Sequence, residues 1–149
     1  MRHLQTDGYA KRIGILDLDQ HYGDGTDQII DRLNLQNIYH VSAGTENRTA
    51  RDAEIFLGQL ARLVRSFERC QVVLYQAGAN PHVNDPLGGW MTTEQLARRD
   101  RIVFETAAQI RLPVAWNLAG GYQRDSAGGI EPVLEIHRNT VKACVSVHL

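Results

Sequence analysis

Two side chains of the kind that bind divalent metals lie two residues apart at the end of an apolar segment. Asp19 and His21 follow the apolar residues of the segment 12–19. On extended backbone, residues two apart point to the same side, so this carboxylate and this imidazole can converge on one point. Carboxylate and imidazole are ligands that suit a borderline divalent ion such as zinc. The pair is equally compatible with a polar strand end that carries a solvated histidine.

A third ligand is expected from the loop 80–89, which reads Asn-Pro-His-Val-Asn-Asp-Pro-Leu-Gly-Gly. Asp85 is the candidate, whereas His82 in the same loop is expected to lie at the surface. Three protein ligands and an open position are the arrangement of a catalytic zinc, which holds a water molecule and polarises a carbonyl. The segment 119–122, Ala-Gly-Gly-Tyr, adds Tyr122. Its hydroxyl could donate a hydrogen bond to a developing oxyanion, although the segment also fits an ordinary turn.

Each of these segments follows a stretch that the residue pattern predicts to be a β-strand. Strands are expected over residues 12–19, 38–42, 71–76 and 113–118, and they alternate with amphipathic helices. Thr26 is expected to cap the first helix, Thr92 and Gln95 have the spacing of a capping box, and Pro132 suits the first turn of the last helix. Strands that alternate with helices predict a parallel sheet covered on both faces, with ligands at the carboxyl ends of the strands. The candidate residues all fall at that edge.

The composition indicates one ordinary globular domain spanning residues 1–149. The chain has 16 Lys and Arg against 17 Asp and Glu, which argues against nucleic-acid binding. No apolar run approaches the ~18–20 residues of a membrane span, and no secretory signal is visible. Two cysteines that form no recognisable motif fit a reduced, cytoplasmic protein. A nucleotide-binding domain is disfavoured because Gly23-Asp24-Gly25 is not the glycine pattern of a phosphate loop.

The motifs together resemble the histone deacetylase superfamily, which includes acetylpolyamine amidohydrolases and acetoin-utilisation proteins. The resemblance rests on segments that occur in the family's order: residues 15–26, 74–81, 85–88, 96–104 and 119–122. It covers most of the chain from about residue 12 onward. It implies a three-layer α/β/α fold with a mainly parallel sheet, like that of arginase and the deacetylases, truncated at the N-terminal side. It also implies hydrolysis of an acetylated protein or of a small acetylated amine.

The resemblance assigns roles to single residues. Asp19, His21 and Asp85 match the family's zinc ligands, and Tyr122 matches the hydroxyl that stabilises the tetrahedral intermediate. Asp17 and Asp24 match the carboxylates that orient two catalytic histidines, although either could instead cap the turn at Gly23 or the helix that follows. The set that matches a monovalent-cation site, usually for potassium, consists of the Asp17 carboxylate, the carbonyls of Asp19 and His21, Ser42 and the Ala43 carbonyl.

The sequence departs from the family at the general base. The family's histidine pair precedes the Asp-x-His strand, but the sixteen residues before Asp17 contain a single histidine, His3. Because a positioned general base contributes ~10²–10⁴-fold in rate, the isolated chain is expected to turn over poorly or not at all. The alternative is an inactive metal-binding module that needs a partner chain. In either case a shortened sheet exposes a strand edge, which predicts self-association. Asn80 stands where the family usually has Asp.

Overall fold

Strands and helices alternate along the chain, as the sequence predicts. The computed structural model describes residues 5–8, 10–44 and 49–148, so His3 lies outside the described residues. The elements are β1 (Ile13–Asp17), α2 (Asp24–Arg32), β2 (Ile38–Ser42), α3 (Ala50–Arg65), β3 (Val72–Gly78), α4 (Thr93–Gln109), β4 (Val114–Ala119) and α5 (Glu131–His148). The predicted α/β class is confirmed.

The four strands form one parallel sheet in the order β2-β1-β3-β4. In register, Asp17 at the end of β1 lies between Ser42 of β2 and Gln76 of β3. Because all strands run the same way, their carboxyl ends meet at one edge of the sheet. The loops that carry the candidate residues leave from that edge.

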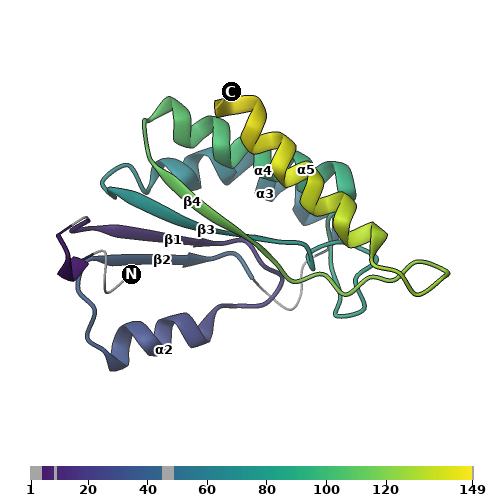
Figure 1. The fold of residues 1–149 in the computed structure, drawn as a ribbon, viewed down its shortest axis with the longest axis horizontal. Helices are drawn as coiled ribbons and strands as arrows, with labels where there is room; N and C mark the ends of the chain where they lie inside the picture. The colour runs from purple at the N-terminus through teal and green to yellow at the C-terminus, as the bar shows by residue number, and fades with distance from the viewer. Residues whose placement is uncertain (1–4, 9, 45–48, 149) are drawn as a thin grey trace.

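Helices lie on both faces of the sheet, and the two layers are unequal (Figure 1). Helices α3, α4 and α5 cover one face, where the rings of Tyr75 and Trp116 pack edge-on against Phe104 of α4. Helix α2 lies on the other face, where His40 of β2 contacts its Asp27. No residue of α2 is buried. The expected three layers are confirmed, but α2 covers only part of its face.

The hydrophobic core lies between the sheet and helices α3 to α5. Its fully buried members include Leu16, Leu60, Phe67 and Val103. Among the described residues, no helix is long and apolar enough to span a lipid bilayer.

Two helix starts show how far local signals decide the fold. Helix α4 begins after Thr92 with the predicted capping box. The backbone N–H of Gln95 donates to Thr92 Oγ1 over 3.2 Å, and the backbone N–H of Thr92 donates to Gln95 Oε1 over 2.9 Å. Helix α2 begins at Asp24 rather than after Thr26, and Gly23 is its N-cap. A Cβ atom at residue 23 would lie 2.7 Å from Asp17 Oδ2, so packing against β1 decides where this helix starts.

Candidate metal centre

Asp19 and His21 lie side by side just beyond the end of β1, as predicted. His21 Nδ1 is 3.7 Å from Asp19 Oδ1, and the same oxygen accepts the backbone N–H of His21 over 3.1 Å. The side chain of His21 is 50% exposed and that of Asp19 is 14% exposed. One carboxylate and one imidazole therefore face a common point that solvent can reach.

The loop after β3 adds Asn80 to this pair. Asn80 is buried, and its Nδ2 donates to Asp19 Oδ1 over 2.9 Å and lies 3.5 Å from His21 Nδ1. Its Oδ1 is buried and has no hydrogen-bond partner among the described residues. Where the family usually has a carboxylate, this chain thus has an amide that holds Asp19 in place.

Two glycines let neighbouring loops approach Asp19 closely. A Cβ atom at Gly78 would lie 2.8 Å from Asp19 Cα. One at Gly120 would lie 2.5 Å from Asn80 Oδ1 and 3.2 Å from Asp19 Oδ2, and Gly120 also has a φ of +60°. The loops after β1, β3 and β4 therefore meet at Asp19 with no space for a further side chain.

Asp85 is tied to the tyrosine loop. It is 5% exposed, its Oδ2 accepts the backbone N–H of Tyr122 over 2.8 Å, and its Oδ1 accepts the N–H of Leu87 over 3.0 Å. The Tyr122 residue is 53% exposed. Asp85 thus fixes the backbone at Tyr122 while the phenol remains accessible to solvent.

The structure brings together two of the three predicted metal ligands. Within residues 5–8, 10–44 and 49–148, no group of three His, Cys, Asp or Glu side chains is arranged to hold a metal ion. Asp85 instead accepts the backbone N–H groups of Tyr122 and Leu87. Each oxygen of Asp85 keeps a lone pair beyond the backbone hydrogen bond that it accepts. The three side chains are therefore of types that bind zinc, but Asp85 is not grouped with Asp19 and His21.

The residues of the expected monovalent-cation site lie close together. The Asp17 carbonyl accepts the Ala43 N–H over 2.9 Å, and Ser42 Oγ accepts the Gly23 N–H over 3.0 Å. A Cβ atom at Gly44 would lie 2.2 Å from the His21 carbonyl oxygen, which brings that carbonyl to the same place. Carboxylate, hydroxyl and carbonyl oxygens of this kind suit a hard cation.

Asp17 and Asp24 differ in their surroundings. Asp17 is 6% exposed, and its Oδ1 accepts the N–H of Asp19 and the side-chain amide of Gln76. Burial raises the pKa of Asp17, and the hydrogen bond from the Asp19 backbone opposes that rise. Asp24 is exposed in the first turn of α2, where its negative charge interacts favourably with the helix dipole. Their roles toward histidines stay predictions.

His82 is not at the surface, and that prediction is wrong. It is 6% exposed, its Nε2 lies 3.0 Å from Thr93 Oγ1, and its Nδ1 accepts the N–H of Asn84 over 3.1 Å. Burial lowers the pKa of His82. The ring therefore links the loop of Asp85 to the start of α4.

Several residues near the site escaped sequence reasoning. His40 has a side chain only 4% exposed; its Nδ1 is 2.6 Å from Asp27 Oδ1, and its Nε2 has no partner among the described residues. Arg99 and Asp100 are almost fully buried in α4. The only sequence signal was the adjacent charged pair within an otherwise apolar helix face.

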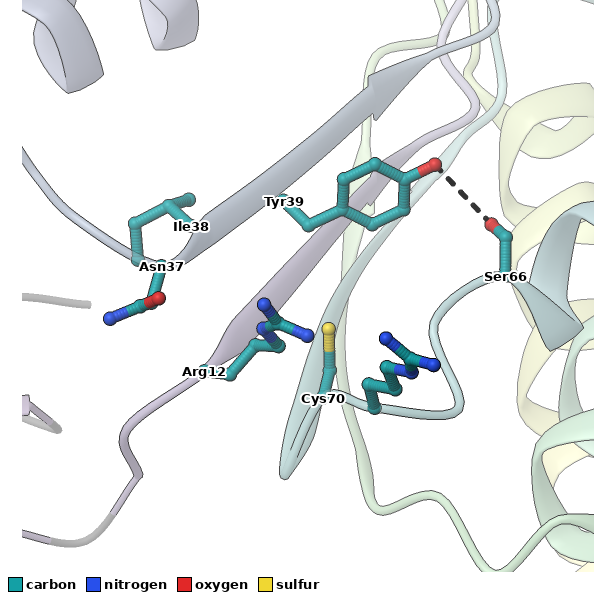
Figure 2. Close-up of a pocket in the computed structure, with 7 residues that line it drawn as sticks. Arg12, Asn37, Ile38, Tyr39, Ser66 and Cys70 are labelled. Atoms are coloured by element: carbon teal, nitrogen blue, oxygen red, sulfur yellow. Dashed lines mark hydrogen bonds between the residues drawn. The ribbon is translucent and has the colours of Figure 1, made fainter.

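A pocket of about 300 Å³ lies at the opposite end of the sheet (Figure 2). It is lined by residues that precede or begin strands, among them Arg12, Ile38 and Cys70. In Figure 2 the hydroxyl of Tyr39 reaches Ser66 across its rim. Because this pocket lies at the amino ends of the strands, it is separate from the candidate metal centre.

Comparison with known proteins identifies the class. Residues 34–132 match the histone deacetylase domain family, so the chain belongs to that family. An uncharacterized protein of Picosynechococcus sp. (strain ATCC 27264 / PCC 7002 / PR-6) is 34% identical over 141 residues, which cover 83% of this chain and 47% of that protein. The chain thus spans about half the length of this curated relative.

The fold is shared with a solved structure. The crystal structure of a histone deacetylase homolog complexed with SAHA superposes with a TM-score of 0.64 at 18% identity. The superposition covers 96% of this chain and 43% of that chain. It confirms the deacetylase-like α/β fold.

Proposed function

We propose that this chain carries the metal-binding part of a zinc-dependent deacetylase. The reaction would be hydrolysis of the amide of an acetylated protein or a small acetylated amine, releasing acetate and the free amine. The observation that carries the proposal is the convergence of three loops on Asp19, which Asn80 holds and against which Gly120 packs. Their occurrence in a member of the histone deacetylase family supports it.

Different residues would bind the metal and stabilise the oxyanion. Asp19, His21 and Asp85 would hold zinc, which when bound supplies a polarised water and a Lewis acid. The exposed hydroxyl of Tyr122 would donate a hydrogen bond to the oxyanion of the reacting carbonyl. The hydrogen bond from the Tyr122 backbone to Asp85 would keep that phenol at a constant distance from the metal ligands.

Other expected residues would act around these. Asp17 and Asp24 would orient histidines supplied from outside the described residues. Potassium would be held by Asp17, Ser42 and the carbonyls of Asp19, His21 and Ala43. The pairing of Asp17 with Ser42 across β1 and β2, and the bond from the Ala43 N–H to the Asp17 carbonyl, support this.

Zinc titration by calorimetry tests the proposal. The purified chain should bind one zinc ion, and Asp85→Ala should weaken binding by at least about tenfold, because a ligand is lost. Asp125→Ala is the matched control, because the side chain of Asp125 accepts backbone N–H groups within its own turn, from Ala127 and Gly129. No stoichiometric binding, or binding that Asp85→Ala leaves unchanged, contradicts the proposal.

A second candidate is an inactive metal-binding module that requires a partner chain. It is favoured by the chain spanning only 47% and 43% of two longer relatives. It is also favoured by β4, which is one of the two edge strands of the described sheet. Deacetylation of an acetyl-lysine reporter by the purified chain alone would exclude this candidate. Activity that appears only with an added partner would support it.

A further inference from the structure

A buried arginine lies directly beneath the loops of the candidate metal centre. Arg99 of α4 is 1% exposed. Its Nη1 donates to the carbonyl of Leu18 over 3.1 Å and to the carbonyl of Gly78 over 2.7 Å. Leu18 directly precedes Asp19, and Gly78 ends β3 two residues before Asn80. One guanidinium nitrogen therefore joins the exits of β1 and β3. The residues that follow these exits form the hydrogen bond between Asp19 and Asn80.

The rest of the cluster holds the guanidinium in one orientation. Its Nε donates to Asp100 Oδ1 over 2.7 Å. The hydroxyl of Tyr75 also donates to Asp100 Oδ1, and Thr140 Oγ1 donates to Asp100 Oδ2 over 2.5 Å. All these groups are almost fully buried. A buried charge is costly unless it is paired. Here Nε of Arg99 pairs with Asp100, which leaves Nη1 to donate to the two carbonyls.

The third loop is reached from α5. His137 is half-buried and is hydrogen-bonded to the backbone of Gly120. Its Nδ1 and Arg99 Nη2 are both buried without a partner among the described residues. Arg99 Nη2 is a donor, and His137 Nδ1 is an acceptor when the ring is neutral and protonated on Nε2. Arg99 and His137 together thus touch the exits of β1, β3 and β4.

We infer that Arg99 is a positioning residue, whose bonds to the Leu18 and Gly78 carbonyls hold Asp19 and Asn80 in register for metal binding, while His137 holds the turn at Gly120. The consequence for metal binding rests on the proposed function. The consequence for loop order does not, because the bonds to the carbonyls join atoms of this chain alone.

The experiment compares Arg99→Lys with Arg98→Lys. Arg98 is the matched control because it lies next to Arg99 in α4 and forms an exposed ion pair with Glu54 of α3. Hydrogen exchange is measured without metal, and zinc affinity is measured by calorimetry. Arg99→Lys should speed exchange by at least about tenfold in residues 18–23 and 78–80 and weaken zinc binding by about 10–100-fold. Arg98→Lys should change neither.

The pattern of exchange separates positioning from general stability. His137→Gln should speed exchange at residues 120–122 and leave residues 18–23 unchanged. Unchanged loops in Arg99→Lys, or an equal rise across all four strands, would overturn the inference. If Arg99→Lys does not fold, couplings between the Arg99 side-chain nitrogen and the carbonyl carbons of Leu18 and Gly78 can be sought in the wild-type chain by NMR, and their absence would overturn it. Zinc that fails to bind the wild-type chain refutes the proposed function alone.

Discussion

The carboxylate of Asp85 accepts the backbone N–H of Tyr122 across 2.8 Å and thereby joins the loop after β3 to the loop after β4. The carboxylate is buried, so this bond is protected from water. A single residue therefore links the expected third metal ligand to the expected oxyanion donor. Any change at Asp85 acts on both.

Replacing Asp85 separates these two effects. In Asp85→Asn the one amide oxygen can still accept the Tyr122 N–H but can no longer also accept the Leu87 N–H. The backbone at Tyr122 should therefore stay ordered while zinc binding weakens. In Asp85→Ala the backbone N–H groups of Tyr122 and Leu87 both lose their acceptor, which should lower the free energy of unfolding by about 1–3 kcal/mol. Urea unfolding and exchange at Tyr122 measure the difference. Equal loss of order in both variants would show that the charge, rather than the hydrogen bond, holds the loop.

Tyr122→Phe removes only the exposed hydroxyl. Because the described structure shows no hydrogen bond from this hydroxyl, the free energy of unfolding should change by less than about 0.5 kcal/mol. Zinc affinity should be unchanged as well. In a preparation with deacetylase activity, losing an oxyanion donor should reduce kcat by about 10²–10³-fold. A variant that keeps full activity would remove Tyr122 from the proposed mechanism.

Stability should fall as the pH drops below neutrality. Burial lowers the pKa of His82 and of His137 below the ordinary value of 6.5. As the pH falls through 6.5, the unfolded chain binds protons that the folded chain does not, so the free energy of unfolding decreases. The decrease ends below the folded-state pKa values, where both states are protonated.

Urea unfolding between about pH 7.5 and pH 5.5 measures this dependence. His82→Gln and His137→Gln should each make the dependence shallower. His148→Gln serves as the control, because His148 is exposed at the last position of α5. A pH dependence that neither substitution alters would contradict the prediction.

Self-association is expected along the side formed by β4 and α5. β4 is one of the two edge strands of the described sheet, and α5 exposes Leu134, Val141 and Val145 opposite its buried face. Light scattering should show species larger than the monomer at high concentration. Val141→Lys should shift them toward monomer, whereas Ile55→Lys on α3, which replaces another exposed apolar side chain, should not. A monomer at all concentrations would contradict this prediction.

The parts of the fold that were predictable depend on short-range signals. The capping box between Thr92 and Gln95 starts α4. Asp19 and His21 lie beside each other as expected, although residues 19–21 form a bend beyond β1 rather than the extended backbone from which their proximity was predicted. The order of strands and helices follows from the same local patterns. Family motifs supplied Asp85 and Tyr122, which the structure joins by a hydrogen bond.

The parts that were not predictable depend on contacts between distant segments. Arg99 is buried because its partners are backbone carbonyls far away in the chain, which have no sequence signal. His82 is buried because its loop returns over α4. Helix α2 starts early because Gly23 packs against Asp17 and His40.

The position of β1 in the sheet has a consequence for how the chain folds. β1 lies between β2 and β3, and the residues that pair across β1 and β3 are 59 positions apart. A sheet dominated by such distant pairings forms slowly, because a long loop must close before any bond is made. On the ribosome, β1 can pair only with β2 until β3 emerges. During that interval its other edge is open to pairing with another nascent chain, which makes the residues of β1 the point at which misassembly during synthesis would begin.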